Sequence, residues 1–511
     1  MKPEFKNLFK FQSNKKSKQA IIDLGSNSVR MLIYDNFKIS PIPVFNEKAV
    51  CKLGKNLDKS KKLNPDGIKS SLKVLNRFKE ILDISDVQDL EIIATAAFRE
   101  ATDASEFLRE IEKIFNKKPL VLSGEEEART SANGVIIGFD EVDGLVADLG
   151  GGSLELARVS KNQIIETTSL PLGVLRLKNN PIIKKRNLGK YVRKCLRDEK
   201  WLSKKKFKNI YLVGGTWRSL FKYHLFKEKH PLHILHQYKL SKDVAVNYLN
   251  RISKFNKSSL KSLEYITKSR TPYLPFSSII LNEIIEAASP SKVICSISGL
   301  REGHMNTIIN QGVSEDEIFK LKTDGISFKK GDYGKSFEKY FNFISPLFED
   351  NEYFNRRLLT LACILSKMDW GLGAFQKAEL VFMEVLNTPL LKLNHKDRVK
   401  VASASFWRHC GLKYNPDYEF LSLLNNNEIL SSKQVGSALR LAESLTSMSS
   451  LLLDEFKIYK RNKTIFLKIP NNHSDIVSKQ VTKRLKNLAR EMNVDSNICL
   501  LYTSPSPRDR G

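Results

Sequence analysis

Apolar and polar positions along the first 310 residues alternate between strand-like and helix-like periods. The apolar run at 19–25 (QAIIDLG) ends at a glycine, and a second apolar run at 29–35 (VRMLIYD) follows three polar residues later, which predicts a hairpin. Helical spacing of apolar residues at 66–84 and 96–116 flanks a short predicted strand at 91–95. This alternation of strands and helices predicts an α/β sheet with crossover connections.

The same pattern recurs in the next part of the chain. Residues 144–160 again read as strand, glycine turn and strand, with an aspartate and a glycine placed as in 19–25, and a strand at 209–215 ends at two glycines before a helix. Such a repeat indicates internal duplication. We therefore expect two α/β domains of one design, at 19–145 and 146–310, with a ligand cleft between them.

Beyond residue 310 glycines become rarer and long amphipathic helices dominate, as at 354–370. We expect a mostly helical C-terminal domain at 311–500 that contains a single β-hairpin near 456–469. The basic residues 1–18 form an unpatterned tail. Residues 501–511 have a composition typical of turns and disorder and match nothing before them, which makes them a candidate for a non-native addition.

Composition limits the class of protein and its compartment. No stretch approaches the roughly 20 apolar residues of a membrane-spanning helix, and the N-terminus has no apolar core of a signal peptide, so we expect a cytoplasmic protein without membrane insertion. The six cysteines lie far apart without a CxxC pair. They are expected to be reduced core residues and not disulfides or zinc ligands.

The chain is strongly basic. Its 84 lysines and arginines exceed the 56 aspartates and glutamates, which gives a net charge of +28 that attracts polyanions. Polyphosphate, nucleic acid and a membrane surface all fit this charge, and so does an even spread of lysine over every surface. Nucleic acid is the weaker interpretation, because no nucleic-acid recognition motif is present.

Two glycine-containing loops and a glycine pair are candidates for phosphate binding. DLGSNS at 23–28 and DLGGGS at 148–153 offer backbone N–H groups that small residues leave open to a phosphate, although each loop alone could be a tight hairpin. The candidate phosphate-binding residues of these loops and of the glycine pair are Ser26, Asn27, Ser28, Gly150, Gly151, Gly152, Ser153, Gly214, Gly215 and Thr216.

Each loop begins with an aspartate at the end of an apolar strand. An unpaired carboxylate is costly there, and Mg²⁺ would offset that cost, because it takes one or two carboxylates together with water and phosphate oxygens. Asp23 and Asp148 are therefore candidate Mg²⁺ ligands, with Glu155 as a further acidic residue, and K⁺ is a second candidate cation. Alternatively, each aspartate hydrogen-bonds only its own turn.

A run of three glutamates follows Ser123. Ser123 and Glu126 have the spacing of a capping box, which leaves Glu127 to face the cleft and hold a water for attack on phosphorus. Arg99 is expected near the start of the helix at 96–116, where the helix dipole disfavours a cation and a bound phosphate would reverse that penalty. Glu127 and Arg99 are thus the candidate base and phosphate ligand.

Three histidines form an H-x-x-H-x-x-H run at His230, His233 and His236. No carboxylate or cysteine accompanies them, and their spacing drifts off one face of a helix. A metal site is therefore disfavoured. A phosphate contact or an interdomain contact is the preferred interpretation.

The segments AIIDLGSNSVRMLIYD, IATAAFREA, LSGEEEA, VADLGGGSLELA, SLPLGVLRL, YLVGGTWRSL and ISGLREG occur in the order typical of one family. Over roughly residues 19–308 the chain resembles the exopolyphosphatase and guanosine pentaphosphate phosphohydrolase (Ppx/GppA phosphatase) family. The resemblance implies a duplicated actin-like (ribonuclease H-like) ATPase fold with a mostly α-helical C-terminal domain. That domain more loosely resembles metal-dependent phosphohydrolase domains, but no His-Asp dipeptide exists in the sequence, so we expect a degenerate HD-like domain that serves binding or homodimer contacts.

The resemblance also implies roles for individual residues. Glu127 aligns with the water-activating base, Asp148 with the Mg²⁺ ligand, Glu155 with a nearby acidic residue and Arg99 with the phosphate-binding arginine. Asn27, Ser28, Gly150 to Ser153 and Gly215 align with the phosphate loops. The expected activity is Mg²⁺-dependent release of orthophosphate from the ends of inorganic polyphosphate. Conversion of guanosine pentaphosphate to guanosine tetraphosphate at the same site, and a polyphosphate or nucleotide sensor without turnover, are the alternatives.

Overall fold

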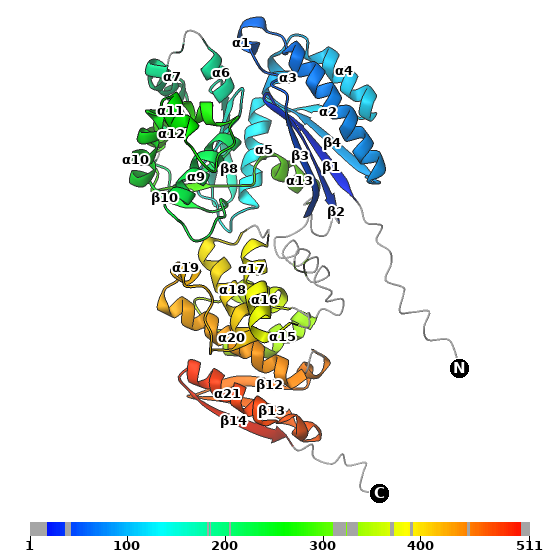
Figure 1. Ribbon diagram of the computed structural model, residues 1–511, viewed down its shortest axis with the longest axis vertical. Coiled ribbons are helices and arrows are strands. Elements are labelled where there is room, and N and C mark those ends of the chain that lie inside the picture. Colours follow the sequence, from blue (N-terminus) through cyan, green and yellow to red (C-terminus); the bar gives the residue numbers. More distant parts are fainter. Residues whose placement is uncertain are drawn as a thin grey trace, which may run out of the picture. The chain divides into compact units, whose positions relative to one another are not determined.

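The computed structural model of the 511-residue chain divides into two compact units, Met1–Ser314 and Glu315–Gly511 (Figure 1). The residues that it describes are 18–35, 42–180, 183, 185–203, 206–309, 323, 326, 336–367, 372–388, 392–446 and 450–501. The predicted tails at 1–18 and 501–511 lie outside these residues, except for Lys18 and Leu501.

The first lobe of unit 1 is a five-stranded sheet with the strand order β3-β2-β1-β4-β5. Its strands are β1 (Gln19–Leu24), β2 (Ser28–Asp35), β3 (Ile42–Val50), β4 (Asp89–Ala94) and β5 (Leu120–Val121). Its helices are α1 (Leu57–Ser60), α2 (Pro65–Ile84), α3 (Ala96–Glu100) and α4 (Ala104–Phe115). Strands β1 to β3 are antiparallel neighbours, whereas β4 joins β1 in parallel after a crossover through α2.

The second lobe repeats this topology in the sheet β10-β11-β9-β6-β7-β8. Its strands are β6 (Gly144–Leu149), β7 (Leu154–Ser160), β8 (Gln163–Leu170), β9 (Asn209–Val213), β10 (Lys239–Ser241) and β11 (Lys292–Cys295). Its helices are α6 (Val174–Asn179), α7 (Lys185–Asp198), α8 (Lys200–Ser203), α9 (Gly215–Lys227), α10 (Lys242–Ser253), α11 (Lys257–Lys261) and α12 (Leu274–Ala288). Strands β6, β7, β8, β9 and β11 correspond in order and direction to β1 through β5, which confirms the predicted duplication.

Two helices are exchanged between the lobes (Figure 1). Helix α5 (Gly124–Ile136) follows β5, yet Ala132 and Val135 pack in the core of the second sheet. Helix α13 (Leu300–Ile309) follows β11, yet Met305 packs in the core of the first. A Cβ on Gly134 of α5 would lie 2.0 Å from the backbone oxygen of Gly299, so the helices meet where neither backbone carries a side chain. This crossing fixes both lobes around α5.

Unit 2 is mostly helical, as expected. Its helices are α15 (Ser336–Ile344), α16 (Arg356–Leu365), α17 (Ala374–Asn387), α18 (His395–Cys410), α19 (Tyr418–Leu421), α20 (Asn426–Thr446) and α21 (Lys479–Glu491). The predicted hairpin is present as β12 (Lys457–Arg461) and β13 (Thr464–Pro470), but β14 (Asp495–Leu501) pairs in parallel with β13 and extends it to a three-stranded sheet. The third strand was missed, because it adjoins the hairpin only after the crossover through α21.

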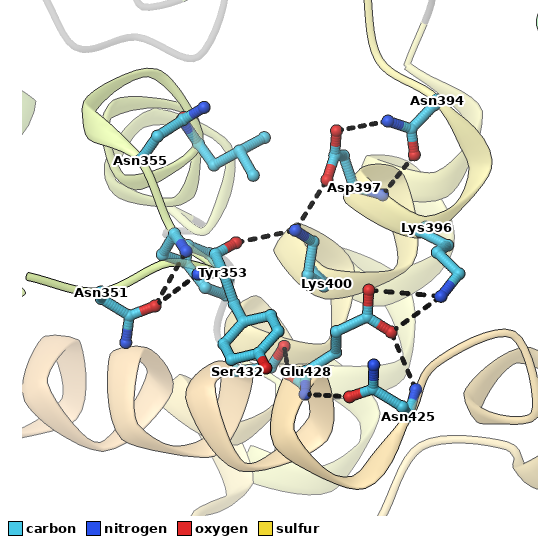
Figure 2. A network of polar contacts seen from close by, with 12 residues as sticks. Asn351, Tyr353, Asn355, Asn394, Lys396, Asp397, Lys400, Asn425, Glu428 and Ser432 are labelled. Carbon is cyan, nitrogen blue, oxygen red and sulfur yellow. Dashed lines mark hydrogen bonds and ion pairs between the residues drawn. The ribbon is translucent and has the colours of Figure 1, made fainter.

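A polar network ties α18 and α20 to the segment before α16 (Figure 2). The buried ammonium of Lys400 donates to the backbone oxygen of Tyr353 at 2.7 Å and lies 2.7 Å from a carboxylate oxygen of Asp397. The Glu428 carboxylate accepts from the backbone N–H of Asn425, while the Asn425 side chain accepts from the backbone N–H of Glu428. These bonds cap α20 and satisfy polar groups that burial would otherwise leave unpaired.

No helix among the described residues is both long and apolar enough to cross a membrane. All six cysteines are described, and none forms a disulfide.

Candidate active site

The two predicted phosphate loops have the same construction. The N–H of Gly25 donates to the backbone oxygen of Ser28 at 3.0 Å, and the N–H of Gly150 donates to that of Ser153 at the same distance. The loops also contact each other, because a Cβ on Gly152 would lie 2.9 Å from the Ser26 hydroxyl oxygen. The two loop tips therefore lie next to each other, and both line the cleft described below.

The predicted glycine pair, Gly214 and Gly215, lies beside the two phosphate loops and lines the same cleft. Gly214 has φ of +101°, and a Cβ there would lie 2.5 Å from the backbone oxygen of Leu149, so glycine alone fits the turn from β9 into α9. Helix α9 then begins at Gly215, and Thr216 behind it is buried. The first turn of α9 therefore directs backbone N–H groups toward the second loop.

These elements line a cleft of about 210 Å³ between the lobes. The predicted site residues that line it are Asp23, Ser26, Asn27, Ser28, Glu127, Asp148, Gly150, Gly151, Gly152, Ser153, Gly214, Gly215 and Thr216. Arg99 and Glu155 are outside the lining, and each lies behind a carboxylate that does line it, Glu127 and Asp148 respectively.

The predicted capping box at the start of α5 is present. The Ser123 hydroxyl accepts from the N–H of Glu126, and the Glu126 carboxylate accepts from the N–H of Ser123 at 2.7 Å. Glu127 points the other way, is only 11% exposed, and accepts a 2.5 Å hydrogen bond from Nη1 of Arg99. The same nitrogen donates to the backbone oxygen of Leu122 at 2.9 Å.

One expectation about Arg99 was wrong. The helix predicted at 96–116 is broken into α3 and α4, so Arg99 lies in the last turn of a five-residue helix and not near the start of a long one. The helix dipole therefore imposes no penalty on its charge. Arg99 is instead fixed by Glu127 and by the end of β5.

Burial makes Glu127 an unusually weak acid. Desolvation raises the pKa of Glu127 to about 7 against the opposing effect of Arg99, and the charges of Asp148 and Asp23 raise it further. A carboxyl group with this pKa exchanges protons near neutral pH. Glu127 is therefore suited to accept a proton from a water in the cleft.

The aspartates of the two loops have different partners. Asp148 lies directly opposite Glu155 in the pairing of β6 with β7, whereas Asp23 lies opposite Arg30 in the pairing of β1 with β2. The Asp23 carboxylate accepts from Nη1 of Arg301 at 3.1 Å. Asp23 thus has a cation at its side, and Asp148 has a second acid.

Asp148 and Glu155 are held by hydroxyl groups. Ser131 donates to Asp148 at 2.5 Å and Ser169 donates to Glu155 at 2.9 Å. Burial nevertheless raises the pKa of Asp148, and burial followed by the charges of Glu127 and Asp148 raises that of Glu155 well above its ordinary value. Carboxylates placed this way favour a bound cation.

The donor set fits Mg²⁺ better than a metal held by protein alone. Among the described residues no group of three or more histidine, cysteine, aspartate or glutamate side chains is arranged to hold a metal ion. Mg²⁺ needs no such cage, because it takes one or two carboxylates and completes its shell with water and phosphate oxygens. Asp148 lines the cleft and can supply the carboxylate.

Sequence reasoning missed the cations of the cleft. They are Arg30, Lys48, Arg218, Arg270 and Arg301. Burial, followed by the charge of Arg301, lowers the pKa of Arg30 to about 10. A polyanion would relieve this repulsion between cations. Arg218 and Arg301 stand in the recognised segments YLVGGTWRSL and ISGLREG, which offered a signal, whereas Lys48 lies on β3, a strand that was not predicted.

The three histidines lie outside the cleft. Nε2 of His236 is 2.9 Å from the backbone oxygen of Gly138, the His233 ring packs 4.3 Å from that of Phe226, and the His230 ring lies 5.0 Å from that of Tyr238. The run is not helical, and its side chains face separate neighbours. The expected phosphate contact is thus not made in this cleft, whereas His236 does contact Gly138 across the predicted domain boundary at residue 145.

Two protein-family models match this chain, each over a different part of its length. Residues 32–311 match the sequence model of the Ppx/GppA phosphatase family, and residues 344–496 match that of the exopolyphosphatase C-terminal domain. Two solved structures share the fold and cover 58% of this chain and 99% of their own. They are the Ppx/GppA family member of Aquifex aeolicus (24% identity, TM-score 0.50) and an exopolyphosphatase from Cytophaga hutchinsonii (21% identity, TM-score 0.53).

Curated relatives are similar over shorter regions. The bifunctional 3-dehydroquinate synthase/phosphatase of Fusobacterium nucleatum is 28% identical over 298 residues, which are 54% of this chain and 44% of the relative. The guanosine-5′-triphosphate,3′-diphosphate pyrophosphatase of Aeromonas hydrophila is 33% identical over 162 residues, 32% of this chain and 33% of the relative. The chain thus spans less than half the length of these curated relatives. With the duplicated actin-like fold and the family match over residues 32–311, the chain belongs to the Ppx/GppA phosphatase family.

Proposed function

We propose that this chain hydrolyses the terminal phosphoanhydride bond of inorganic polyphosphate and releases orthophosphate. The observation that carries the proposal is the contact of Arg99 with Glu127 beside two phosphate loops. A protein that only bound phosphate would need the loops and the cations. It would not need a buried carboxylate held by an arginine beside those loops.

Glu127 acts on water in this proposal. Its carboxylate orients a water in the cleft and takes up the proton as the oxygen attacks phosphorus, a contribution worth about 10² to 10⁴ in rate. Arg99 holds the carboxylate in place and supplies positive charge near the reacting phosphate. The backbone N–H groups at the tips of the two loops, at 26–27 and 151–152, position the terminal phosphoryl group.

Mg²⁺ would be held by Asp148, with Glu155 behind it as a further acidic residue. When bound there, the ion neutralises charge on the phosphate oxygens. The Asp23 carboxylate is already paired with Arg301 and serves chiefly to fix that arginine at the edge of the cleft.

The cations of the cleft favour a long polyanion as substrate. Arg30, Lys48, Arg218, Arg270 and Arg301 line one continuous cleft with the phosphate loops, so several consecutive phosphates can be neutralised together. The match of residues 344–496 to the exopolyphosphatase C-terminal domain supports the same substrate. A homodimer remains our expectation for the assembly.

Guanosine pentaphosphate is the second candidate substrate. The similarity to the Aeromonas hydrophila enzyme favours it, and its terminal phosphate would occupy the same loops. The purified chain should be assayed with both substrates side by side, with Mg²⁺ and at equal concentrations of terminal phosphate. Faster orthophosphate release from long polyphosphate supports the proposal. Faster release from guanosine pentaphosphate would make that nucleotide the preferred substrate in place of polyphosphate. Tight binding of either compound without orthophosphate release would indicate a sensor.

A further inference from the structure

A second cavity of about 330 Å³ lies on the far side of the phosphate loops. Its walls come from α1 and the loop before it, from α3, and from α6 of the second lobe. It shares five lining residues with the catalytic cleft, namely Ser26, Ala96, Gly151, Gly152 and Leu175. The loop tips are therefore a partition between two cavities.

The partition consists of small groups and one leucine side chain. A Cβ on Gly152 would lie 2.9 Å from the Ser26 hydroxyl oxygen and 3.2 Å from the methyl group of Ala96, and a Cβ on Gly151 would lie 2.8 Å from Cδ1 of Leu175. Rotation of a serine side chain and a small shift of a glycine loop are low-barrier motions. Such motions would have to open the partition before an orthophosphate could pass.

Arg176 spans the second cavity between the lobes. From α6 it forms an ion pair with Asp58 of α1 at 3.1 Å and another with Glu100 of α3, and its side chain is only 16% exposed. Glu100 directly follows Arg99, whose guanidinium contacts Glu127. Helix α3 thus connects the catalytic contact on one side with the ion pairs of Arg176 on the other.

Long-chain hydrolysis creates a problem of product release. The attacked phosphoryl group lies at the loops beside Glu127, and the shortened chain stays in the cleft, bound by its cations. The new orthophosphate is therefore enclosed between the loops and the chain. Building on the proposed function, we infer that orthophosphate leaves through the second cavity, past the ion pairs that Arg176 forms with Asp58 and Glu100.

The chemistry of the second cavity suits this passage. Asn56 and Asn179 supply amides, Lys59 and Arg176 supply cations, and Asp58, which is paired with Arg176, supplies a carboxylate. A volume of roughly 15 Å³ suffices for one water, so the cavity has room for a hydrated orthophosphate. Asp58 and Glu100 offset the charge of Arg176, so a passing anion would not be trapped there.

A side chain that fills the cavity tests the inference. Asn179→Trp adds an indole at an exposed position in the wall of the second cavity, and Lys59→Trp adds one from α1. If one of the two variants does not fold, the other still tests the inference. Lys55→Trp, at an exposed position outside the lining, is the matched control. Rapid-quench assays with long polyphosphate measure the first turnover and the steady state separately.

We expect both filled variants to keep the first turnover within about twofold, to show a burst of one orthophosphate per site, and to lose at least about tenfold in steady-state rate. Tripolyphosphate, whose short leaving group can clear the cleft, should be hydrolysed at nearly the rate of the wild type. A steady-state rate on long polyphosphate equal to that of Lys55→Trp would overturn the exit route, and so would equal slowing on both substrates. If the wild type hydrolyses neither substrate, the proposed function itself has failed.

Discussion

Nη1 of Arg99 lies 2.5 Å from Oε2 of Glu127, although 28 positions separate the two residues in sequence. The contact gives a direct prediction. Arg99→Gln should lower kcat about 10² to 10³-fold, because both the charge near the reacting phosphate and the restraint on Glu127 are lost. Arg99→Lys keeps the charge without the fork and should retain more activity. Steady-state kinetics on the preferred substrate measures both, and unchanged kcat in Arg99→Gln would leave Arg99 with only a structural role.

The pH dependence of kcat/KM reports on Glu127. Its carboxylate is the active form, so activity should rise with pH and level off above about 7, and Mg²⁺ near Asp148 should move this limb to lower pH. The effect on stability has the opposite sign. Because the pKa is raised, folded Glu127 keeps its proton at pH values where the unfolded chain has lost it. The free energy of unfolding that this tighter proton binding contributes is therefore lost as pH rises from about 4.5 to 7.

Glu127→Gln removes this titration and should therefore be at least as stable as the wild type at pH 8. Thermal melts of the two proteins at pH 5 and pH 8 measure the difference. A wild type that is stabilised relative to Glu127→Gln at pH 8 would show that the carboxylate is not penalised by its burial.

The two loop aspartates should differ in their effect on Mg²⁺. Asp148→Asn removes the candidate ligand and should raise the Mg²⁺ concentration for half-maximal activity about 100-fold or more. Asp23→Asn breaks the pair with Arg301 and should change KM more than the Mg²⁺ requirement. Mn²⁺ titration monitored by electron paramagnetic resonance gives a second readout that does not depend on turnover. Equal effects of both substitutions on metal affinity would place the ion between the aspartates.

The crossing of α5 and α13 should tolerate no side chain at Gly134. In Gly134→Ala the new Cβ would lie 2.0 Å from the backbone oxygen of Gly299, so the helices must separate, at about 1–3 kcal/mol or more in the free energy of unfolding. Denaturant titration of Gly134→Ala against Asn133→Ala, on the same helix, measures this cost. A stability loss no larger than that of the control would mean that the crossing adjusts freely.

The hairpins, the duplication and the capping box could be predicted from sequence, because each rests on local chemistry. Continuous apolar runs mark β1 and β2, glycines mark the loop ends, and Ser123 with Glu126 has the spacing of a cap. The third strands β3 and β8 were missed. Both strands lie at an edge of their sheets, and neither has the continuous apolar run of the central strands, so the apolar pattern does not predict them.

Long-range relationships account for the rest. Arg30 and Lys48 become neighbours only through the register of β2 with β3, and Arg301 reaches Asp23 only because α13 crosses to the other lobe. The break between α3 and α4 changes the position of Arg99 in its helix, and the spacing of apolar residues does not predict that break. Pairwise contacts of this kind depend on the assembled fold, so motif recognition could find some of these residues but not their partners.

Glu127→Gln tests the central claim most directly. Orthophosphate release from long polyphosphate with Mg²⁺ should fall at least about 100-fold in this variant, while polyphosphate still binds, because the loops and the cleft cations are unchanged. Near wild-type release by a folded Glu127→Gln protein would contradict the assignment of Glu127 as the base that activates water.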